Sequence, residues 1–316
     1  MTRRCVGACP SSHATSRGFS LVELMVALAL GLAVSALVAR VWTNNRQAFR
    51  NQENSARIQE NARFALQLLE RELRMTGYKG LNQEGGAGNQ MFGTNGNTNN
   101  GLYPPLVGYN DTAYNIFGAG GASVSSDTLV VAFYGSGANG VADNTVTNCF
   151  GYGIPAGMLV QDTFSVAPQT WNGFTMPALM CNSTYGGAYG SLGPLVFGVE
   201  SLQVLYGEET DGLGTGVLNR LVHAGLVTNF DNVTQVRVSL LVRGEDRTVT
   251  TAQGQSNAMK TVSSAAPWGT KYYHFGKTYA TTDASDTGAV SDMTSATDGR
   301  HRELVSTTVS LRNRIN

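Results

Sequence analysis

Apolar residues follow two different patterns in the first 80 positions of the chain. Phe19 to Ala39 form a run of 21 residues with one charged side chain, Glu23. A helix of this length spans about 30 Å, the thickness of the hydrocarbon core of a bilayer. The run therefore predicts a transmembrane helix. The alternative is a cleaved secretory signal, which has a shorter apolar stretch followed by small residues at its cleavage site.

The next stretch, Arg40 to Thr76, contains no proline or glycine. Its apolar residues recur at spacings of three and four, which predicts an amphipathic helix with one apolar face. The predicted face consists of Ile58, Ala62, Ala65, Leu66, Leu69 and Leu73. We expect one continuous helix from Phe19 to Thr76, capped by Gly77, whose second half packs this face on the rest of the chain. A membrane anchor followed by an unrelated helix is the alternative.

The remainder of the chain predicts strands and polar loops. Residues 82–101 are rich in Gly and Asn and predict a surface loop. Alternation with period two is clearest in Val233–Arg243 and predicts one buried and one solvated face. Its expected buried residues are Val236, Val238, Leu240 and Val242, and its expected solvated residues are Gln235, Arg237, Ser239 and Leu241. Further strands are predicted at Asp127–Tyr134, Met158–Phe164, Leu195–Tyr206 (as one or two elements) and Glu303–Leu311.

These elements predict an α+β fold. A long N-terminal α-helix, membrane-spanning in its first half, packs on a mainly antiparallel β-sheet with long Gly/Asn-rich loops. The predicted parts are an N-terminal leader at 1–18, a transmembrane helix at 19–39, its amphipathic continuation at 40–78, and a β-rich globular domain at 79–316. The leader carries Arg3, Arg4 and Arg17 and no acidic residue. This charge asymmetry predicts a cytoplasmic N-terminus and an exported, periplasmic or extracellular body.

Composition agrees with an exported structural domain. Only 14% of the residues are charged, and 38 are glycine, which favours short strands joined by polar loops. The formal net charge is zero, so no global field attracts nucleic acid, and we expect no direct nucleic-acid partner.

The four cysteines fall into two pairs, Cys5 with Cys9 in the leader and Cys149 with Cys181 in the body. Their spacing does not fit a zinc site. If the body is exported, an oxidising compartment favours a Cys149–Cys181 disulfide. Two buried free thiols are the alternative.

Glu23 is unusual because it lies five residues into the apolar run. A carboxylate at the bilayer centre costs about 2.5–3.5 kcal/mol on insertion scales, and less near an interface. Glu23 is therefore either tolerated near the cytoplasmic interface or has a partner. An uncapped amine on a neighbouring subunit is a suitable partner.

The segment Arg17-Gly18-Phe19-Ser20-Leu21-Val22-Glu23 resembles the type III signal of type IV prepilins and pseudopilins. The resemblance implies that a membrane-embedded prepilin peptidase cuts between Gly18 and Phe19 and N-methylates Phe19. Glu23 then becomes the fifth residue of the mature chain. In this family that glutamate pairs with the N-terminal amine of an adjacent subunit, which makes Glu23 the expected assembly salt bridge.

Other segments resemble the PilW group of minor pilins. They are Arg57–Leu66, Arg71–Tyr78, Phe197–Gly207 and Leu304–Arg314. One departure from major pilins is visible: the apolar half of the helix contains no proline, and Gly31 is its only weak point.

The resemblance implies a minor pilin, a structural subunit that primes or caps type IV pilus assembly and so supports twitching motility and attachment. Its implied partners are the prepilin peptidase, other minor pilins, the major pilin, the inner-membrane assembly platform and inner-membrane lipid. The implied location is the inner membrane as a single-pass protein, and afterwards the pilus at the cell surface. Two alternatives to a minor pilin are a pseudopilin of a type II secretion system and a filament-tip adhesin.

No catalytic motif accompanies these features. The four histidines, His13, His223, His274 and His301, are isolated in sequence, and no metalloprotease, nucleophile-elbow or phosphate-loop motif is present. The turn Glu208–Gly214 slightly resembles a calcium loop but lacks its alternating acids, so a plain acidic turn is favoured. We therefore expect no enzyme activity, no cofactor and no metal.

Overall fold

The computed structural model describes residues 19–79, 104–115, 123–138, 140–171, 173–185, 189–211, 217–247, 271–293 and 300–314. The leader with Gly18, Cys5 and Cys9 and the predicted loop at 82–101 lie outside these residues. The chain divides into two compact units, residues 1–50 and residues 51–316. The second unit is called the body below.

The long helix predicted from the sequence is present as α1, Leu21–Met75, with 55 residues. The amide of Leu24 donates to the carbonyl of Ser20 at 3.1 Å and opens the helix. Gly31 does not interrupt it. Gly77 follows its C-terminus with a φ of +77°, a conformation that glycine adopts without steric cost.

Within the body, α1 buries the predicted apolar face. Ile58, Ala62, Ala65, Leu69 and Leu73 are at most 1% exposed, and Leu66 is half-buried at the margin. Two polar residues share the buried side, Asn54 and Glu72, and the helical period did not predict them. The amide of Gly77 donates to the carbonyl of Ala132 at 2.9 Å, which fixes the end of α1 to a strand of the body.

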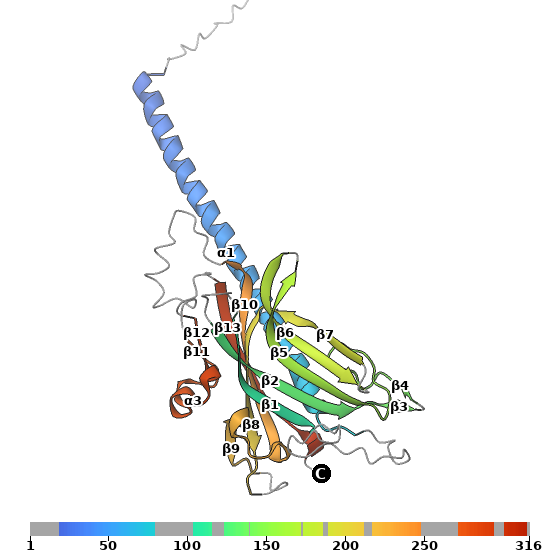
Figure 1. Cartoon of the computed structure of the whole chain (residues 1–316). Coiled ribbons are helices and arrows are strands. Elements are labelled where there is room, and N and C mark those ends of the chain that lie inside the picture. The colour runs from blue at the N-terminus through green and yellow to red at the C-terminus, as the bar shows by residue number, and fades with distance from the viewer. Residues whose placement is uncertain are drawn as a thin grey trace, which may run out of the picture. The chain divides into compact units, whose positions relative to one another are not determined.

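Two antiparallel sheets form most of the body (Figure 1). The larger has the strand order β1-β2-β5-β6-β7. Its strands are β1 (Leu106–Asn115), β2 (Ser123–Tyr134), β5 (Leu159–Trp171), β6 (Phe174–Tyr185) and β7 (Tyr189–Phe197). The strand predictions at Asp127–Tyr134 and Met158–Phe164 are confirmed, although both observed strands are longer.

The second sheet has the order β13-β10-β8-β9. Its strands are β8 (Val199–Glu208), β9 (Arg220–His223), β10 (Val233–Arg247) and β13 (Arg300–Ser310). The predicted stretch Leu195–Tyr206 is two strands, because the chain passes from β7 to β8 through Gly198. Gly198 has a φ of +87°, and its amide donates to the carbonyl of Pro177 at 2.8 Å.

Smaller elements complete the described body. The two short hairpins pair β3 with β4 and β11 with β12. Their bounds are Gly137–Ala138, Val141–Ala142, Lys271–Tyr273 and Val290–Asp292. The short helices are α3 (Lys277–Thr282) and the 3-10 turns η1 (Ala224–Leu226), η2 (Phe230–Asn232), η3 (Thr287–Ala289) and η4 (Arg312–Arg314).

The prediction of one solvated face on β10 is wrong. The expected buried residues from Val236 to Val242 are buried, but Ser239 and Leu241 on the other face are also 0% exposed. The segment 271–293 covers that face: His274 is hydrogen-bonded to Ser239 at 3.0 Å, and Leu241 packs with Met293.

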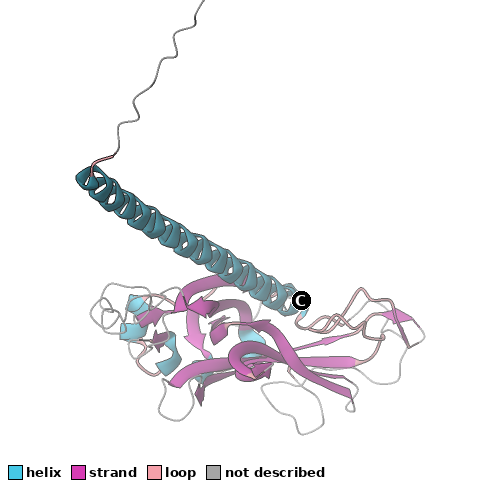
Figure 2. Cartoon of the chain, turned by 90° about the horizontal axis from the view of Figure 1, so that it is seen from above, coloured by secondary structure: helices cyan, strands magenta, loops and turns pink. Residues whose placement is uncertain are grey.

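A single large apolar core joins the body-facing part of α1 to both sheets. Figure 2 shows the strands of the body in magenta with the helices in cyan. The fold is therefore α+β, with a long N-terminal helix packed on antiparallel sheets, as the sequence predicted.

Candidate functional site

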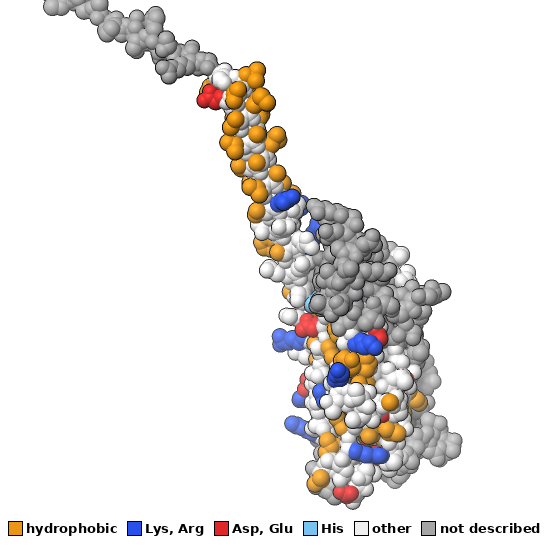
Figure 3. All heavy atoms as spheres, turned by 90° about the vertical axis from the view of Figure 1, so that its left-hand side faces the viewer, with side chains coloured by type: hydrophobic (Ala, Val, Ile, Leu, Met, Phe, Trp, Pro, Cys, Tyr) orange, Lys and Arg blue, Asp and Glu red, His pale blue; other side chains and the backbone are white. Residues whose placement is uncertain are grey.

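The N-terminal part of α1, from Leu21 to Arg50, buries no side chain within the chain. Figure 3 shows hydrophobic side chains covering the visible face of this part of the helix. Fourteen large apolar side chains there are each at least 52% exposed: Leu21, Val22, Leu24, Met25, Val26, Leu28, Leu30, Leu32, Val34, Leu37, Val38, Val41, Trp42 and Phe49. A soluble helix would not leave such a surface in water. By length and composition α1 can cross a membrane.

Polar groups in this apolar segment are few, and their positions differ. Ser35 donates its hydroxyl to the carbonyl of Gly31 at 2.8 Å, so the helix itself satisfies it. Glu23 lies in the first turn of α1 and is exposed. An acidic side chain in a first turn interacts favourably with the free helix amides, by about 0.3–1 kcal/mol. That effect alone does not require a carboxylate within an apolar surface.

The predicted site residues of the N-terminus are thus only partly described. Phe19 is 83% exposed and precedes the helix, Glu23 is four residues further on, and Gly18 lies outside the described residues. The structure places Phe19 and Glu23 at the same end of the same uncovered apolar segment. Cleavage, methylation and pairing remain predictions for these residues.

The two cysteines of the body are joined in the structure. Cys149 and Cys181 are bonded at 1.98 Å, with 6.6 Å between their Cα atoms. Cys181 lies on β6, and Cys149 lies in the loop before β5. Both are buried, so the bond ties this loop to the larger sheet from inside.

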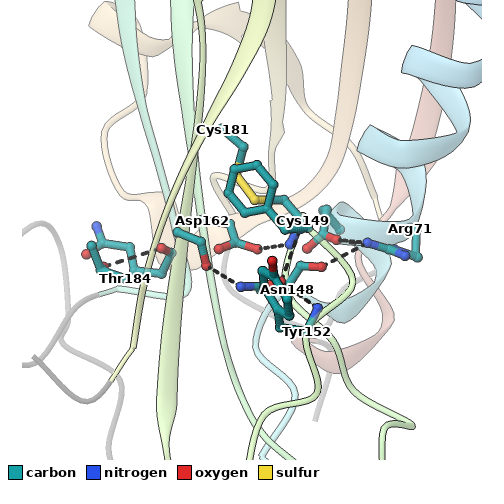
Figure 4. The surroundings of a disulfide bond; sticks show 11 residues. Arg71, Asn148, Cys149, Tyr152, Asp162, Cys181 and Thr184 are labelled. Carbon is teal, nitrogen blue, oxygen red and sulfur yellow. Dashed lines mark hydrogen bonds and ion pairs between the residues drawn. A yellow bond between two sulfur atoms is a disulfide. The ribbon is translucent and has the colours of Figure 1, made fainter. Parts of the chain in front are cut away.

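A polar group beside the disulfide, buried except for the Arg71 side chain, connects the loop to α1 (Figure 4). Arg71 pairs with Glu72 at 2.7 Å and also donates to the carbonyl of Asn148 at 3.2 Å. Asp162 accepts the amide of Cys149 at 2.8 Å. No sequence pattern predicts this group, because its members come from α1, β5 and a loop.

Glu72 and Asp162 are buried carboxyl groups that influence each other's pKa. Burial, and after it the neighbouring Asp162 carboxylate, raise the pKa of Glu72 to about 8. Burial also raises the pKa of Asp162, to about 6. Glu72 Oε2 and Asp162 Oδ1 are buried without another partner among the described residues.

The second sheet contains a buried ion cluster that spans three strands. Glu200 on β8 accepts from Arg302 on β13 at 2.6 and 3.0 Å, and from Arg243 on β10 at 3.3 Å. All three side chains are at most 5% exposed. The cluster fixes the register of β8, β10 and β13 because a bidentate arginine accepts only one position of its carboxylate.

The acidic turn after β8 does not form a calcium loop in its described part. Glu208 is enclosed by Arg220 at 2.6 Å and by the amide of Asn229 at 2.9 Å. Although burial alone would raise its pKa, hydrogen bonds from Thr228 and Arg220 hold the pKa of Glu208 below its usual value. Its oxygens are already used by the protein.

The histidines of the body occupy structural positions. His274 is buried between Ser239 and Ser291, and burial lowers its pKa to about 3, so it is neutral. His223 lies 3.0 Å from Ser285, but Asp283 accepts from Ser285 at 2.5 Å instead of orienting the imidazole. This arrangement differs from a serine–histidine–acid triad, in which the acid holds the histidine.

Two family models match parts of the chain. Residues 163–313 match the family described as Type IV Pilus-assembly protein W, and residues 14–39 match the prokaryotic N-terminal methylation motif. A pilin-like protein, PilA3 of Thermus thermophilus, is 32% identical over 94 residues, which cover 30% of this chain and 36% of that relative. The solved type IV-like pilin TTHA1219 from Thermus thermophilus is 16% identical with a TM-score of 0.42, over 83% of this chain and 97% of that one.

Proposed function

We propose that the chain is a minor pilin of the PilW family that primes or caps a type IV pilus, because residues 163–313 match the family described as Type IV Pilus-assembly protein W and residues 14–39 match the N-terminal methylation motif. Pilin-like proteins of this family are structural, not enzymes. The observation that carries the proposal is the uncovered apolar start of α1, continuous with a helix that the body covers. We infer that the apolar start of α1 leaves the lipid during assembly and packs in a bundle of similar helices.

Processing is the first step of the proposed mechanism. The basic leader stays in the cytoplasm, and the apolar segment holds the chain in the inner membrane with its body in the periplasm. The prepilin peptidase cuts after Gly18 and methylates Phe19. Removal of the leader creates the amine that Glu23 of a neighbouring subunit requires.

Assembly then exchanges lipid contacts for helix contacts. Extraction of the apolar segment exposes no apolar surface to water if other pilins cover it at once. Glu23 selects the register of this packing, because an unmatched charge is costly in a low dielectric and a matched one is not. The partners are other minor pilins and the major pilin, at the inner-membrane assembly platform.

Deletion of the gene tests the function. We expect loss of surface filaments and of twitching motility with normal protein secretion, and recovery of both when the wild-type gene is returned. Normal filaments with lost secretion would identify a pseudopilin of a type II secretion system instead. Normal filaments with lost attachment would identify a tip adhesin.

Chemical analysis of the mature protein tests processing and export. N-terminal sequencing should begin at methylated Phe19, and Gly18→Val should block cleavage. Peptide mapping without reductant should recover Cys149 linked to Cys181, while Cys5 and Cys9 are absent. A mature protein that retains Met1 in cells with active prepilin peptidase, or two alkylatable thiols in the exported body, would contradict this assignment.

A further inference from the structure

Strand β13 is an outer strand of the second sheet, and within the described chain no strand pairs with its far edge (Figure 1). It pairs with β10 in one unbroken register from Arg302 to Ser310. In the same register, the amide of Leu311 donates to the carbonyl of Thr234 at 2.8 Å. Hydrogen-bonded positions alternate along an antiparallel pair, so the odd-numbered residues of β13 bond to β10. The backbone amides and carbonyls of the even-numbered residues therefore point away from β10. These residues are Leu304, Ser306, Thr308 and Ser310.

The other outer strands of the two sheets are interrupted or short. The register of β1 shifts at Asp111, which has a φ of +54°. Strand β7 contains Pro194, and its pairing with β6 shifts between Leu179 and Met180. Strand β9 has only four residues. Proteins use such features to prevent pairing at sheet edges. Residues 304–310 of β13 include no proline, glycine or charged side chain, so this edge remains able to pair.

A groove between β13 and α1 borders the free edge. Leu66 of α1 and Val305 of β13 line it. Both pack against the main apolar core, but both are only half-buried. Arg63 and Glu303 line the groove as well, and neither forms an ion pair with a described residue. A strand added to β13 would complete the burial of the two apolar side chains and lie close to both charges.

The direction of β13 excludes one occupant of this edge. Near the start of β13, Gly244 of β10 lies against α1, because a Cβ atom on Gly244 would be 2.3 Å from Asn54 Oδ1. Beyond the end of β13, the side-chain amide of Asn313 donates to the carbonyl of Arg74 at 3.1 Å. Strand β13 therefore runs in the same direction as the body-facing part of α1. Two copies anchored in one membrane have parallel helices, so their β13 strands cannot form the antiparallel pair of a two-fold dimer.

We propose that the free edge of β13 binds an extended strand of a neighbouring, different pilin-like subunit, which adds to the second sheet and fills the groove against α1. Its backbone bonds to the even-numbered residues of β13 and provides the affinity. Its side chains provide the specificity: small apolar residues at alternate positions toward Leu66 and Val305, an acid near Arg63 and a base near Glu303. That the partner is a pilin-like subunit rests on the proposed function, whereas the free edge does not.

Photocrosslinking in cells that assemble filaments tests the edge. p-Benzoylphenylalanine in place of Thr308, which is exposed, should form an adduct with another filament subunit. Mass spectrometry should map this adduct to an extended segment of that subunit. The matched control is the same crosslinker at Ser191, which is exposed on the proline-containing strand β7 and should give no such adduct. No adduct from Thr308, an equal adduct from Ser191, or an adduct with β13 of a second copy would overturn the proposal.

Proline substitutions separate strand binding from folding. Ser306→Pro removes an amide that points to the free edge, where proline is tolerated. The unfolding temperature of the full-length protein in detergent should not change. The adduct yield from Thr308 should fall about tenfold, because one hydrogen bond is lost and the proline ring blocks the added strand. Thr307→Pro removes an amide that bonds to β10 and should destabilise the body instead. An unchanged adduct yield in Ser306→Pro, or equal destabilisation by both prolines, would contradict the free edge.

Gene deletion distinguishes a failure of this proposal from a failure of the proposed function. Loss of filaments on deletion, without an adduct from Thr308, would overturn the strand addition and leave the minor-pilin assignment intact. Normal pili with lost secretion on deletion, together with an adduct between Thr308 and another pseudopilin, would overturn that assignment and support the strand addition.

Discussion

The two halves of α1 differ in what their apolar residues contact. From Leu21 to Arg50 no side chain is buried, although this half is the more apolar. From Asn51 onward the helix buries a stripe that begins at Ile58 and ends at Leu73. One continuous helix therefore contains two apolar patterns, an exposed apolar segment in its first half and a buried apolar stripe in its second half. The body covers the apolar stripe of the second half, and no described residue of the chain covers the large apolar side chains of the first.

The largest expected effect lies on the body side, at the buried ion cluster. Glu200→Ala leaves Arg302 and Arg243 buried without their carboxylate, and should lower the free energy of unfolding by about 3–5 kcal/mol. Urea unfolding of the full-length protein in detergent, followed by near-UV circular dichroism, measures this loss. Glu53→Ala is the matched control, because the Glu53–Arg57 pair at 2.8 Å is exposed, and it should change stability by less than about 1 kcal/mol. If Glu200→Ala and Glu53→Ala lowered the free energy of unfolding equally, the Glu200 cluster would stabilise the body no more than an exposed ion pair does.

A pair of leucine substitutions compares the two halves of α1 directly. Leu69→Ala removes a side chain that is 0% exposed and should destabilise the body by ~3 kcal/mol. Leu30→Ala removes one that is 63% exposed and should leave the unfolding of the body unchanged. The same urea experiment measures both. A destabilised body in the Leu30 variant would contradict the separation of the two halves.

The buried face of the second half of α1 could be predicted from sequence, because apolar residues at spacings of three and four lie on one side of a helix. Buried polar partners could not be predicted in this way. Glu200 pairs with Arg243 and Arg302, which lie 43 and 102 residues away in the sequence. No local sequence pattern predicts such a pair. The same limit explains the error on β10, since Ser239 is covered by His274, 35 positions later.

The strands of the larger sheet show a second limit. Strands β1 and β6 were not predicted, because polar residues such as Asn182 and Thr184 interrupt any apolar alternation on β6. Their burial depends on neighbours in the sheet and on the disulfide, not on local pattern.

The Glu72–Asp162 pair should give the body a pH-dependent stability. Its raised pKa means that folded Glu72 keeps a proton that the unfolded chain releases above pH 4.5. Stability should therefore be highest below this pH and fall as pH rises, until the folded group is ionised near pH 8. The slope should be at most about 1.4 kcal/mol per pH unit. Glu72→Gln should flatten it, and an unchanged slope in this variant would assign the pH dependence to another group.

The smallest expected effect on folding comes from Glu23, and it separates assembly from stability. Glu23→Leu replaces an exposed carboxylate by an apolar residue in an apolar segment, so insertion should be at least as favourable. Unfolding of the body should not change. Incorporation into the complex with other minor pilins should nevertheless be impaired, because the N-terminal amine of a neighbour loses its charge partner. Crosslinking to the other minor pilins, together with a count of surface filaments, measures this.

Ser35→Ala is the matched control in the same segment, because its hydroxyl is satisfied within the helix, and it should assemble normally. Normal complex formation and normal filaments with a stably expressed Glu23→Leu protein would remove the proposed role of Glu23 in register, and would leave its first-turn position in α1 as the remaining explanation.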